Sequence, residues 1–369
     1  MDVYGNIGLR RVINGSGRMT ALGVSTISDE VALWAKNGGQ NYVIIDELID
    51  RAGEIISQYT GGEDSLVTSS ASAGIALSIA GLITKGKLSL LEKLPNTEGL
   101  ANEVVIQKGH AVNYGAPITT MISLAGGKPV EVGHANEVFP AHIEEAITEK
   151  TVALMYVKSH HCVQKGMVSL EEMIKIAHNH NLPILVDAAA EEDLRLYIEK
   201  GADLVAYSGA KAIEATTSGF VTGKKEYITY AKRQYKGIGR AMKVGKENII
   251  GLLKALEIYA NKDKEKELHE QLKVVEYLIE EINKLRGLSA QLTVDEAGRK
   301  IYRAEMKVDS EVLGRDAKAM LKELHDGNPS IHARKHRVNL GYITFDPRPL
   351  NEGDEVEIIN RLKELVEEK

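Results

Sequence analysis

The sequence predicts an α/β protein with a mostly parallel sheet in its larger part and a smaller α+β part. Between residues 61 and 223, short β-rich runs alternate with helical patterns, and repeated β-α-β units are typical of a parallel sheet. Several of these runs are apolar throughout rather than alternating, as expected of strands covered on both faces. After residue 300, strand-like runs stand between helices, which predicts a separate α+β part.

The helices between these strands have recognisable ends. Ser169 to Glu172 reads SLEE, a capping-box pattern, and opens a helix that we expect to run to about Asn181. Gly201 is expected to end a helix over 191–200. The seven expected strands are 66–68, 103–106, 128–132, 151–157, 183–187, 203–208 and 219–223.

The two ends of the chain differ from the middle. Residues 1–60 begin irregularly and then carry one helical pattern at 43–59, while 247–286 are strongly helical and charged. Strand-like runs follow residue 300, with helices expected at 311–325 and 353–368. We therefore expect residues 1–60 to contribute to the small domain, 61–246 to form the large domain, and 247–369 to form a connecting helix and the C-terminal small domain.

The composition narrows the class of protein. The chain has 369 residues, is 43% hydrophobic and 27% charged, and carries a net charge of -6. This charge argues against a dedicated nucleic-acid or membrane-surface protein. One cysteine, Cys162, permits no intramolecular disulfide and fits a reducing compartment. Residues 1–30 lack a signal-peptide pattern, and the apolar stretch from Ala71 to Ile83 is too short to cross a bilayer. We expect a cytoplasmic protein.

A run of small residues, from Thr68 to Gly74, leaves a strand and enters a helix. A helix N-terminus can bind a phosphate when no bulky side chain blocks its N–H groups. Ser70, Ala71 and Ser72 could therefore form a phosphate cup. A small-residue helix packed closely on the sheet explains the run equally well. The run matches neither the GxxxxGK[ST] nor the G-x-G-x-x-G fingerprint.

Asp187 ends the strand PILVD and is followed by three alanines. In an open parallel sheet, the C-terminal ends of the strands line the ligand crevice. A carboxylate there can hold a cofactor ring nitrogen in its protonated form. Taken alone, the position is better explained as a helix N-cap, since Asp is a preferred cap.

Lys211 lies in the run YSGAK, directly after the next strand. Small neighbours and a position at a strand end allow its side chain to enter the crevice, where desolvation would make it a nucleophilic amine. Most lysines are solvated surface groups. The case for Lys211 is the order along the chain of a small-residue loop, an Asp at a strand end and a Lys after the following strand.

This ordered set resembles the fold-type-I pyridoxal-phosphate enzymes, which share the aspartate-aminotransferase-like fold, and within them the bacterial selenocysteine-synthase-like group. The resemblance is densest from Val104 to Glu226. The motifs on which the resemblance rests are SGAK at 208–211, SGFVTGKKE at 218–226 and RVINGSG at 11–17. With NGSGRMTALG at 14–23 and DPRPL at 346–350, the chain is similar to D-glucosaminate-6-phosphate ammonia-lyases and their close relatives. Ala215-Thr216 departs from the Gly-Pro that many relatives carry.

The resemblance implies a role for each matching residue. Lys211 would carry the cofactor as a Schiff base and then move a proton at the substrate α-carbon, and Asp187 would pair with the pyridine nitrogen. His110 follows a strand at the place where relatives stack a residue on the cofactor ring, although a surface-loop histidine is the alternative. The implied cofactor-binding residues are Ser70, Ala71, Ser72, His110, Asp187, Ser208 and Lys211.

Substrate-binding residues are less sharply indicated. Arg348, held between two prolines, could grip a carboxylate with its planar fork, or it could be a surface turn residue. Residues 224–254 hold nine Lys and Arg against two acids; Arg240 and Lys243 in this stretch could bind a substrate phosphate, but a solvated basic face is at least as good an explanation. Thr20, in the N-terminal motif, is a candidate proton donor.

A metal site is not expected. His160, His161 and Cys162 are adjacent in the chain, but no second group of ligands accompanies them.

The resemblance implies a lyase that removes the β-hydroxyl and ammonia from a 2-amino-3-hydroxy acid, namely D-glucosaminate 6-phosphate, and gives a 2-keto-3-deoxy acid. Selenium transfer on seryl-tRNA is the second hypothesis, disfavoured by the acidic net charge and by an N-terminal motif that begins near residue 10, which leaves no room for a tRNA-binding region. A non-catalytic pyridoxal-phosphate-binding protein is the third. Because such enzymes share active sites between subunits, the resemblance also implies a homo-oligomer.

Overall fold

The computed structural model describes residues 3–159, 161–295 and 300–367. The chain forms two compact units, the larger being Ile27–Asn261 and the smaller combining Met1–Thr26 with Lys262–Lys369. Residues 27–60 and 247–261 thus pack with the larger unit, a different division from the boundaries at 60 and 246 that the sequence suggested. Among the described residues, none of the helices is both long and apolar enough to cross a bilayer.

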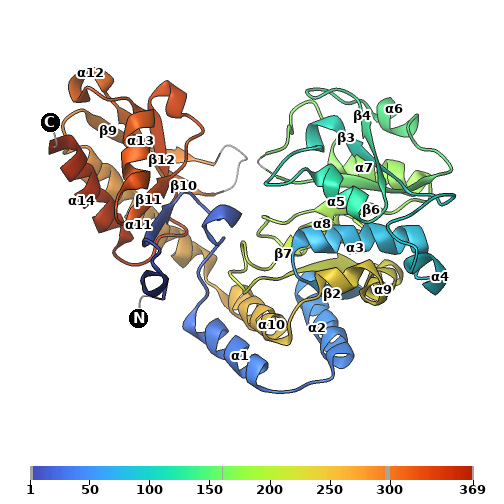
Figure 1. Cartoon of the computed structure of the whole chain (residues 1–369). Helices are drawn as coiled ribbons and strands as arrows, with labels where there is room; N and C mark the ends of the chain where they lie inside the picture. The colour runs from blue at the N-terminus through green and yellow to red at the C-terminus, as the bar shows by residue number, and fades with distance from the viewer. Residues whose placement is uncertain (1–2, 160, 296–299, 368–369) are drawn as a thin grey trace. The chain divides into compact units, whose positions relative to one another are not determined.

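The larger unit is built on a seven-stranded sheet with the order β2-β8-β7-β6-β5-β3-β4 (Figure 1). All neighbouring pairs are parallel except those of β8, which runs antiparallel to both β2 and β7. All seven expected strands are confirmed. They are β2 (Asp64–Thr68), β3 (Glu103–Gln107), β4 (Lys128–Val132), β5 (Thr151–Val157), β6 (Ile184–Asp187), β7 (Leu204–Ser208) and β8 (Gly219–Gly223).

Helix α3 (Ala71–Thr84) is the central helix of this unit, and all of its residues except Ser72 are buried. The start of α3 lies very close to β8. Gly219 of β8 permits this, because a Cβ on Gly219 would lie 2.5 Å from the backbone nitrogen of Ala71. The helix therefore packs directly against the sheet, with contacts to β7 and β8. The remaining α-helices of the unit are α1 (Asp29–Gln40), α2 (Ile45–Thr60), α4 (Leu88–Leu91), α5 (Ile118–Leu124), α6 (Pro140–Glu144), α7 (Leu170–Asn179), α8 (Leu196–Glu199), α9 (Lys225–Arg233) and α10 (Lys246–Asn261).

Two helical expectations need correction. Residues 29–40, expected to be irregular, form α1, which begins at the cap Ser28 and packs along α10. Gly38 allows this contact, because a Cβ there would lie 3.1 Å from Ile250. Packing thus stabilises a helix that its two adjacent glycines would weaken. The helix expected over 191–200 is reduced to α8, since Asp193 caps the turn at Arg195 and Leu196 instead.

The smaller unit has its own core between helices and two small sheets. In one sheet β10 lies between β9 and β12, both antiparallel to it, and in the other β1 pairs in parallel with β11. The N-terminal strand therefore completes a C-terminal fold. The elements are β1 (Val12–Gly15), β9 (Leu288–Val294), β10 (Tyr302–Val308), β11 (Ser330–Ala333), β12 (Tyr342–Phe345), α11 (Lys264–Ile282), α12 (Ser310–Leu313), α13 (Ala317–Asp326) and α14 (Asp354–Glu367).

Candidate active site

Several expected cofactor-binding residues meet at one edge of the large sheet. Strands β2, β6 and β7 have the same direction, so their carboxyl ends share an edge. Ser70 follows β2, Asp187 ends β6, and Lys211 follows β7. Asp187 pairs with Ala206 of β7, the strand that leads to Lys211, and the charge of Lys211 lowers the pKa of Asp187. The edge therefore combines a helix N-terminus, a buried acid and an amine.

The helix N-terminus can accept an anion. Ser70 is the N-cap of α3, and its hydroxyl accepts a hydrogen bond from the N–H of Ala73 at 3.0 Å. The N–H groups at positions 71 and 72 have no acceptor within a helix that starts there. No side chain larger than Ser occupies positions 70–73. This arrangement fits the phosphate of the expected cofactor.

Asp187 is a buried carboxylate, only 7% exposed. Its Oδ1 accepts a hydrogen bond from the N–H of Ala189 at 3.1 Å. Burial raises the pKa of Asp187, while the Ala189 N–H and the charge of Lys211 oppose that shift. A protonated ring nitrogen would supply the further positive partner that such a buried acid favours. The sequence left open that Asp187 is a helix N-cap. The structure shows a single local bond of that kind, from the Ala189 N–H to the Asp187 side chain.

Lys211 stands in a tight loop between β7 and β8. The Gly209 N–H donates to the Ser218 carbonyl and the Ala215 N–H donates to the Gly209 carbonyl, both at 2.9 Å. Gly209 is required there, because a Cβ would lie 2.4 Å from the Ser218 hydroxyl oxygen. Ser208, the last residue of β7, is half-buried at the same edge. The loop fixes the backbone of Lys211 and leaves its side chain half-buried.

His110 does not fit the expected ring-stacking role. Its side chain has no exposed surface, so no face of the imidazole is open to a ligand. Nδ1 accepts a hydrogen bond from the Val157 N–H at 3.3 Å, and Tyr156 packs against the ring edge-to-face with centroids 4.5 Å apart. Burial, with help from the charge of Lys158, lowers the pKa of His110 to about 4. We interpret His110 as a neutral residue that caps the end of β5.

Tyr114 is a candidate that sequence reasoning missed. Its hydroxyl lies 3.3 Å from the Ser72 hydroxyl at the start of α3. Burial raises the pKa of Tyr114, the Ser72 contact lowers it, and the charge of Asp187 raises it further. Tyr114 therefore lies close to both the phosphate cup and the buried acid. An aromatic residue four positions after His110, in the run HAVNY, was the available sequence signal.

The basic stretch after β8 does not form a closed site within one chain. Arg240 lies in the 3-10 helix Ile238–Met242, Lys243 follows it, and both side chains are at least partly exposed. Their phosphate-binding role stays a prediction. Thr20 is likewise exposed, at the start of the 3-10 helix Thr20–Leu22 of the smaller unit.

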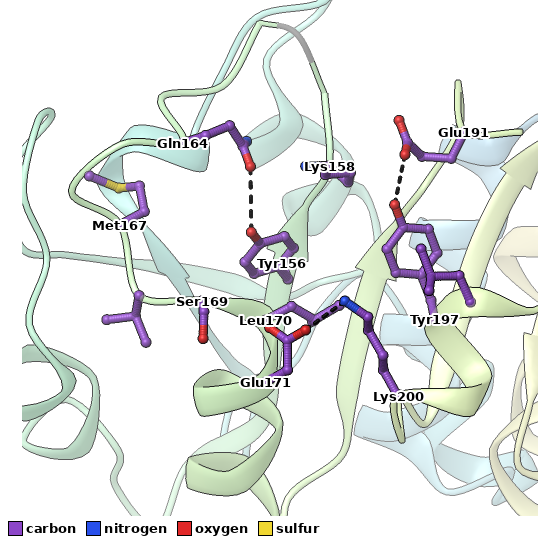
Figure 2. Close-up of a pocket in the computed structure, with 12 residues that line it drawn as sticks. Tyr156, Lys158, Gln164, Met167, Ser169, Leu170, Glu171, Glu191, Tyr197 and Lys200 are labelled. Carbon is purple, nitrogen blue, oxygen red and sulfur yellow. Dashed lines mark hydrogen bonds and ion pairs between the residues drawn. The ribbon is translucent and has the colours of Figure 1, made fainter. Parts of the chain in front are cut away.

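A pocket of about 350 Å³ lies between the end of β5, the start of α7 and the helix α8 (Figure 2). None of the expected cofactor-binding residues lines it. Several of its polar groups are already paired with one another, so it is not the expected cofactor site. The pairs are the Tyr156 hydroxyl with Gln164 at 3.5 Å, the Tyr197 hydroxyl with Glu191 at 2.7 Å, and Lys200 with Glu171 at 2.5 Å.

In the smaller unit, Arg348 is positioned as the sequence suggested, but its fork already holds a carboxylate of the chain. Its Nε and Nη2 donate to the two oxygens of Asp346 at 2.9 and 2.8 Å. Arg303 binds Asp346 at 2.9 Å and Asp295 at 2.8 Å, and all three of these side chains are nearly inaccessible. Asp346 thus organises a buried network of ion pairs.

Arg334, immediately after β11, contributes a third guanidinium to this network. Its Nη1 lies 3.5 Å from the Ser16 carbonyl, and the described residues include no carboxylate in ion-pair contact with it. Burial lowers the pKa of Arg334, and the positive charge of Arg303 lowers it further. Three guanidiniums against the two carboxylates Asp295 and Asp346 leave one positive charge in excess. Arg334 is therefore a better candidate than Arg348 for binding an external anion.

The parts of the chain that the structure describes contain no group of three or more His, Cys, Asp or Glu side chains suited to a metal ion. His160, the first residue of the run considered as a metal site, lies outside the described residues.

These features define an aspartate-aminotransferase-like fold of the type-I class. The solved structure of aspartate aminotransferase from Thermotoga maritima matches with a TM-score of 0.55 at 16% identity, over 96% of this chain and 91% of that one. A solved structure titled D-glucosaminate-6-phosphate ammonia-lyase matches with a TM-score of 0.95 and 46% identity, over 100% and 98%. The expected fold class is confirmed.

The sequence comparisons agree. The family described as L-seryl-tRNA selenium transferase matches residues 12–320. D-glucosaminate-6-phosphate ammonia lyase of Salmonella typhimurium is 47% identical over 99% of this chain and 98% of its own length. A 5'-C-glycyluridine monooxygenase-decarboxylase of a Streptomyces species is 39% identical over 98% and 92%. The chain belongs to the L-seryl-tRNA selenium transferase family, and it is an enzyme.

Proposed function

We propose that the chain is a pyridoxal-phosphate-dependent lyase that acts on D-glucosaminate 6-phosphate. It would eliminate water between the α- and β-carbons, and a water molecule would then hydrolyse the resulting enamine, as its imine, so that the net loss is ammonia. The observation that carries the proposal is the shared edge of Ser70–Ser72, Asp187 and Lys211 in a chain 47% identical to the Salmonella ammonia lyase. Pyridoxal phosphate, when bound, accepts the electron pair that remains when the substrate α-carbon loses its proton. The product is a 2-keto-3-deoxy acid.

The residues of this chain supply binding and proton transfer. Lys211 would hold the cofactor through its amine; once the substrate amine takes its place, the freed Lys211 amine would accept the proton from the substrate α-carbon. Asp187 holds the ring nitrogen in its protonated form, and the N–H groups at the start of α3 hold the phosphate. The β-hydroxyl leaves as water, carrying a proton for which Lys211 and Thr20 are the two candidate donors.

Tyr114 is proposed to cover one face of the cofactor ring, in place of His110. We expect Tyr114→Ala to raise the cofactor dissociation constant roughly three- to tenfold, since an aromatic contact contributes about 0.5–1.5 kcal/mol. Tyr114→Phe keeps the ring and should remain close to wild type. Titration of cofactor-free protein, followed by absorbance, measures both. Tyr4→Ala, at a position that is 63% exposed, is the control; equal affinities for Tyr114→Ala and this control would contradict the role.

Arg334 is proposed to bind the substrate carboxylate, and Arg348 to position Asp346 beside it. Loss of one charge-assisted pair costs about 1.5–3 kcal/mol, so Arg334→Met should raise KM roughly 10- to 100-fold. Arg334→Lys keeps the positive charge without the planar guanidinium, so its KM should lie between those of wild type and Arg334→Met. Arg348→Met should instead lower the melting temperature, because it leaves Asp346 partly unpaired. An unchanged KM in Arg334→Met would exclude Arg334 from carboxylate binding.

The substrate class is tested by ammonia release. Purified enzyme should release ammonia and a 2-keto acid from D-glucosaminate 6-phosphate faster than from unphosphorylated D-glucosaminate or D-serine. Slower release from the phosphorylated acid would move the proposal to a different 2-amino-3-hydroxy acid, and no release from any of them would reject the lyase. Loss of the preference in Arg240→Ala with Lys243→Ala would support phosphate binding by these two residues.

A second candidate function comes from the 39% identity to the monooxygenase-decarboxylase. That chemistry would consume molecular oxygen and release carbon dioxide from an α-amino acid. An oxygen electrode separates it from lyase activity, which needs no oxygen. Selenium transfer is less favoured, since a relative of that name, from Alkaliphilus metalliredigens, is 26% identical. Binding of seryl-tRNA in a gel shift would reverse this order.

We also propose a cytoplasmic homo-oligomer. Exposed apolar side chains gather on α1 and on the segment before α2, where a second copy could cover them. Light scattering of the purified protein should give a dimer or larger species. The group consists of Leu33, Trp34, Tyr42, Val43, Ile44 and Ile45, all at least 44% exposed.

A further inference from the structure

Glu214 has an unusual backbone conformation directly beside Lys211. Its φ is 58°, in the left-handed region that a residue with a Cβ rarely adopts. Of the other non-glycine residues with positive φ, Lys85 and Asn181 stand where helices end, a usual place for this conformation, and Val24 follows the 3-10 helix Thr20–Leu22. Glu214 instead stands inside the loop between β7 and β8. Strained residues of this kind concentrate at functional sites.

Glu214 is the fourth residue of a turn that begins at Lys211, and its backbone conformation directs the chain out of that turn. The Glu214 N–H donates to the Lys211 carbonyl at 3.3 Å, and the next residue, Ala215, donates to Gly209. A turn of this kind brings its first and fourth Cα atoms within about 7 Å. The long side chains of Lys211 and Glu214 therefore start from neighbouring points, and both are half-buried. Ala212 and Ile213, the two residues between them, are buried in the core.

We propose that Glu214 is a positioning residue whose carboxylate favours the protonated form of the nitrogen that Lys211 contributes to the bound cofactor. The inference rests on the proposed function, because it takes Lys211 as the cofactor lysine. A carboxylate near a cationic nitrogen stabilises the cation, more strongly where water is partly excluded. A glycine would adopt the same φ without strain, and the proposed role of the carboxylate gives a reason for an acidic residue at this position.

Other charged and titratable groups also face this edge of the sheet. Asp187, from β6, interacts with the charge of Lys211. Tyr114 and Cys162, from the loops after β3 and β5, both interact with the charge of Asp187, and Lys158 acts on Cys162. These groups remain in place when Glu214 is replaced, so a change in the titration of the bound cofactor reports on Glu214.

The experiment follows the visible absorbance of the holoenzyme against pH in wild type, Glu214→Gln, Glu214→Asp and Glu214→Gly. We expect the titration midpoint to fall by about one pH unit in Glu214→Gln, the low end for an opposite charge within about 4–6 Å. Glu214→Asp should stay near wild type. Glu214→Gly should show the same fall as Glu214→Gln together with a higher melting temperature, because glycine relieves the strained turn while removing the carboxylate.

The outcomes separate the two proposals. Midpoints that coincide in wild type, Glu214→Gln and Glu214→Gly overturn the role of Glu214 while leaving the proposed function intact. A higher melting temperature in Glu214→Gly without a lower midpoint also overturns that role, since Glu214 would then be only a strained turn residue. A wild-type protein that binds pyridoxal phosphate without a visible band, and without borohydride-fixed mass on Lys211, overturns the proposed function and this inference with it.

Discussion

The Lys211→Ala variant should lose covalent attachment of the cofactor and nearly all activity. Lys211 is given two tasks, binding the cofactor and moving the proton at the α-carbon, and removal of a general base alone costs roughly 10²–10⁴ in rate. We therefore expect a fall in kcat of roughly 10³-fold or more. Borohydride reduction followed by peptide mass spectrometry should find the cofactor mass on Lys211 in wild type and nowhere in the variant.

Lys225→Ala provides the control for this experiment, since Lys225 is an exposed lysine at the start of α9. It should keep wild-type labelling and activity. Lys158 is the rival residue, because it follows β5 and its N–H donates to the Asp187 carbonyl at 2.9 Å. Cofactor mass on Lys158 in the wild-type protein would contradict the central assignment.

The Asp346→Asn variant should strongly destabilise the smaller unit. Asp346 is fully buried and binds both Arg303 and Arg348. Asparagine keeps the shape but leaves three buried or half-buried guanidiniums with Asp295 as their nearby carboxylate. Removing one partner of a buried pair costs about 3–5 kcal/mol. Urea unfolding, combined with hydrogen exchange in β10 and β12, measures the loss of stability in this unit.

The pH dependence of this network follows from the direction in which the pKa of Asp346 is shifted. Burial alone would raise the pKa of Asp346, but the hydrogen bonds and charges of Arg348 and Arg303 outweigh it and hold the pKa well below its usual range. The folded pKa is therefore below the unfolded one. The contribution of Asp346 to stability is complete above the unfolded pKa, near 4, and is lost as the pH falls toward the folded pKa.

Asp326→Asn is the matched control, because Asp326 forms an exposed pair with Lys322 on α13. Exposed pairs contribute little, so its unfolding midpoint should stay close to wild type. If Asp346→Asn unfolds at the same urea concentration as this control, Asp346 is not the residue that organises the network.

The sequence was sufficient for the features that depend on local pattern. Uninterrupted apolar runs identified the strands of the large sheet, and the order of Ser70, Asp187 and Lys211 along those strands predicted the edge at which we propose the functional site. Parallel strands end at one edge whatever the details of packing, so these residues could be placed without coordinates. The antiparallel direction of β8 was not evident, since periodicity does not report strand direction.

Tertiary contacts determined what the sequence could not supply. The helix α1 forms because Gly38 allows contact with α10, and no local pattern reports that contact. Arg348 stands in the expected turn, yet its partner proved to be Asp346, two residues before it, rather than an external acid. His110 and Tyr114 lie four residues apart in one loop, and only the burial of the first and the contact of the second with Ser72 distinguish them.

The antiparallel strand β8 also sets the spacing of the strands that carry the proposed cofactor-binding residues. Neighbouring strands lie about 4.8 Å apart, and β8 separates β2 from β7. The strands β2 and β7, which lead to the proposed phosphate cup and to Lys211, are therefore two spacings or about 10 Å apart. The strand β6, which ends in Asp187, is one spacing further on. The sheet thus fixes the spacing of the three strands that carry the residues proposed to bind the ring and the phosphate of the cofactor.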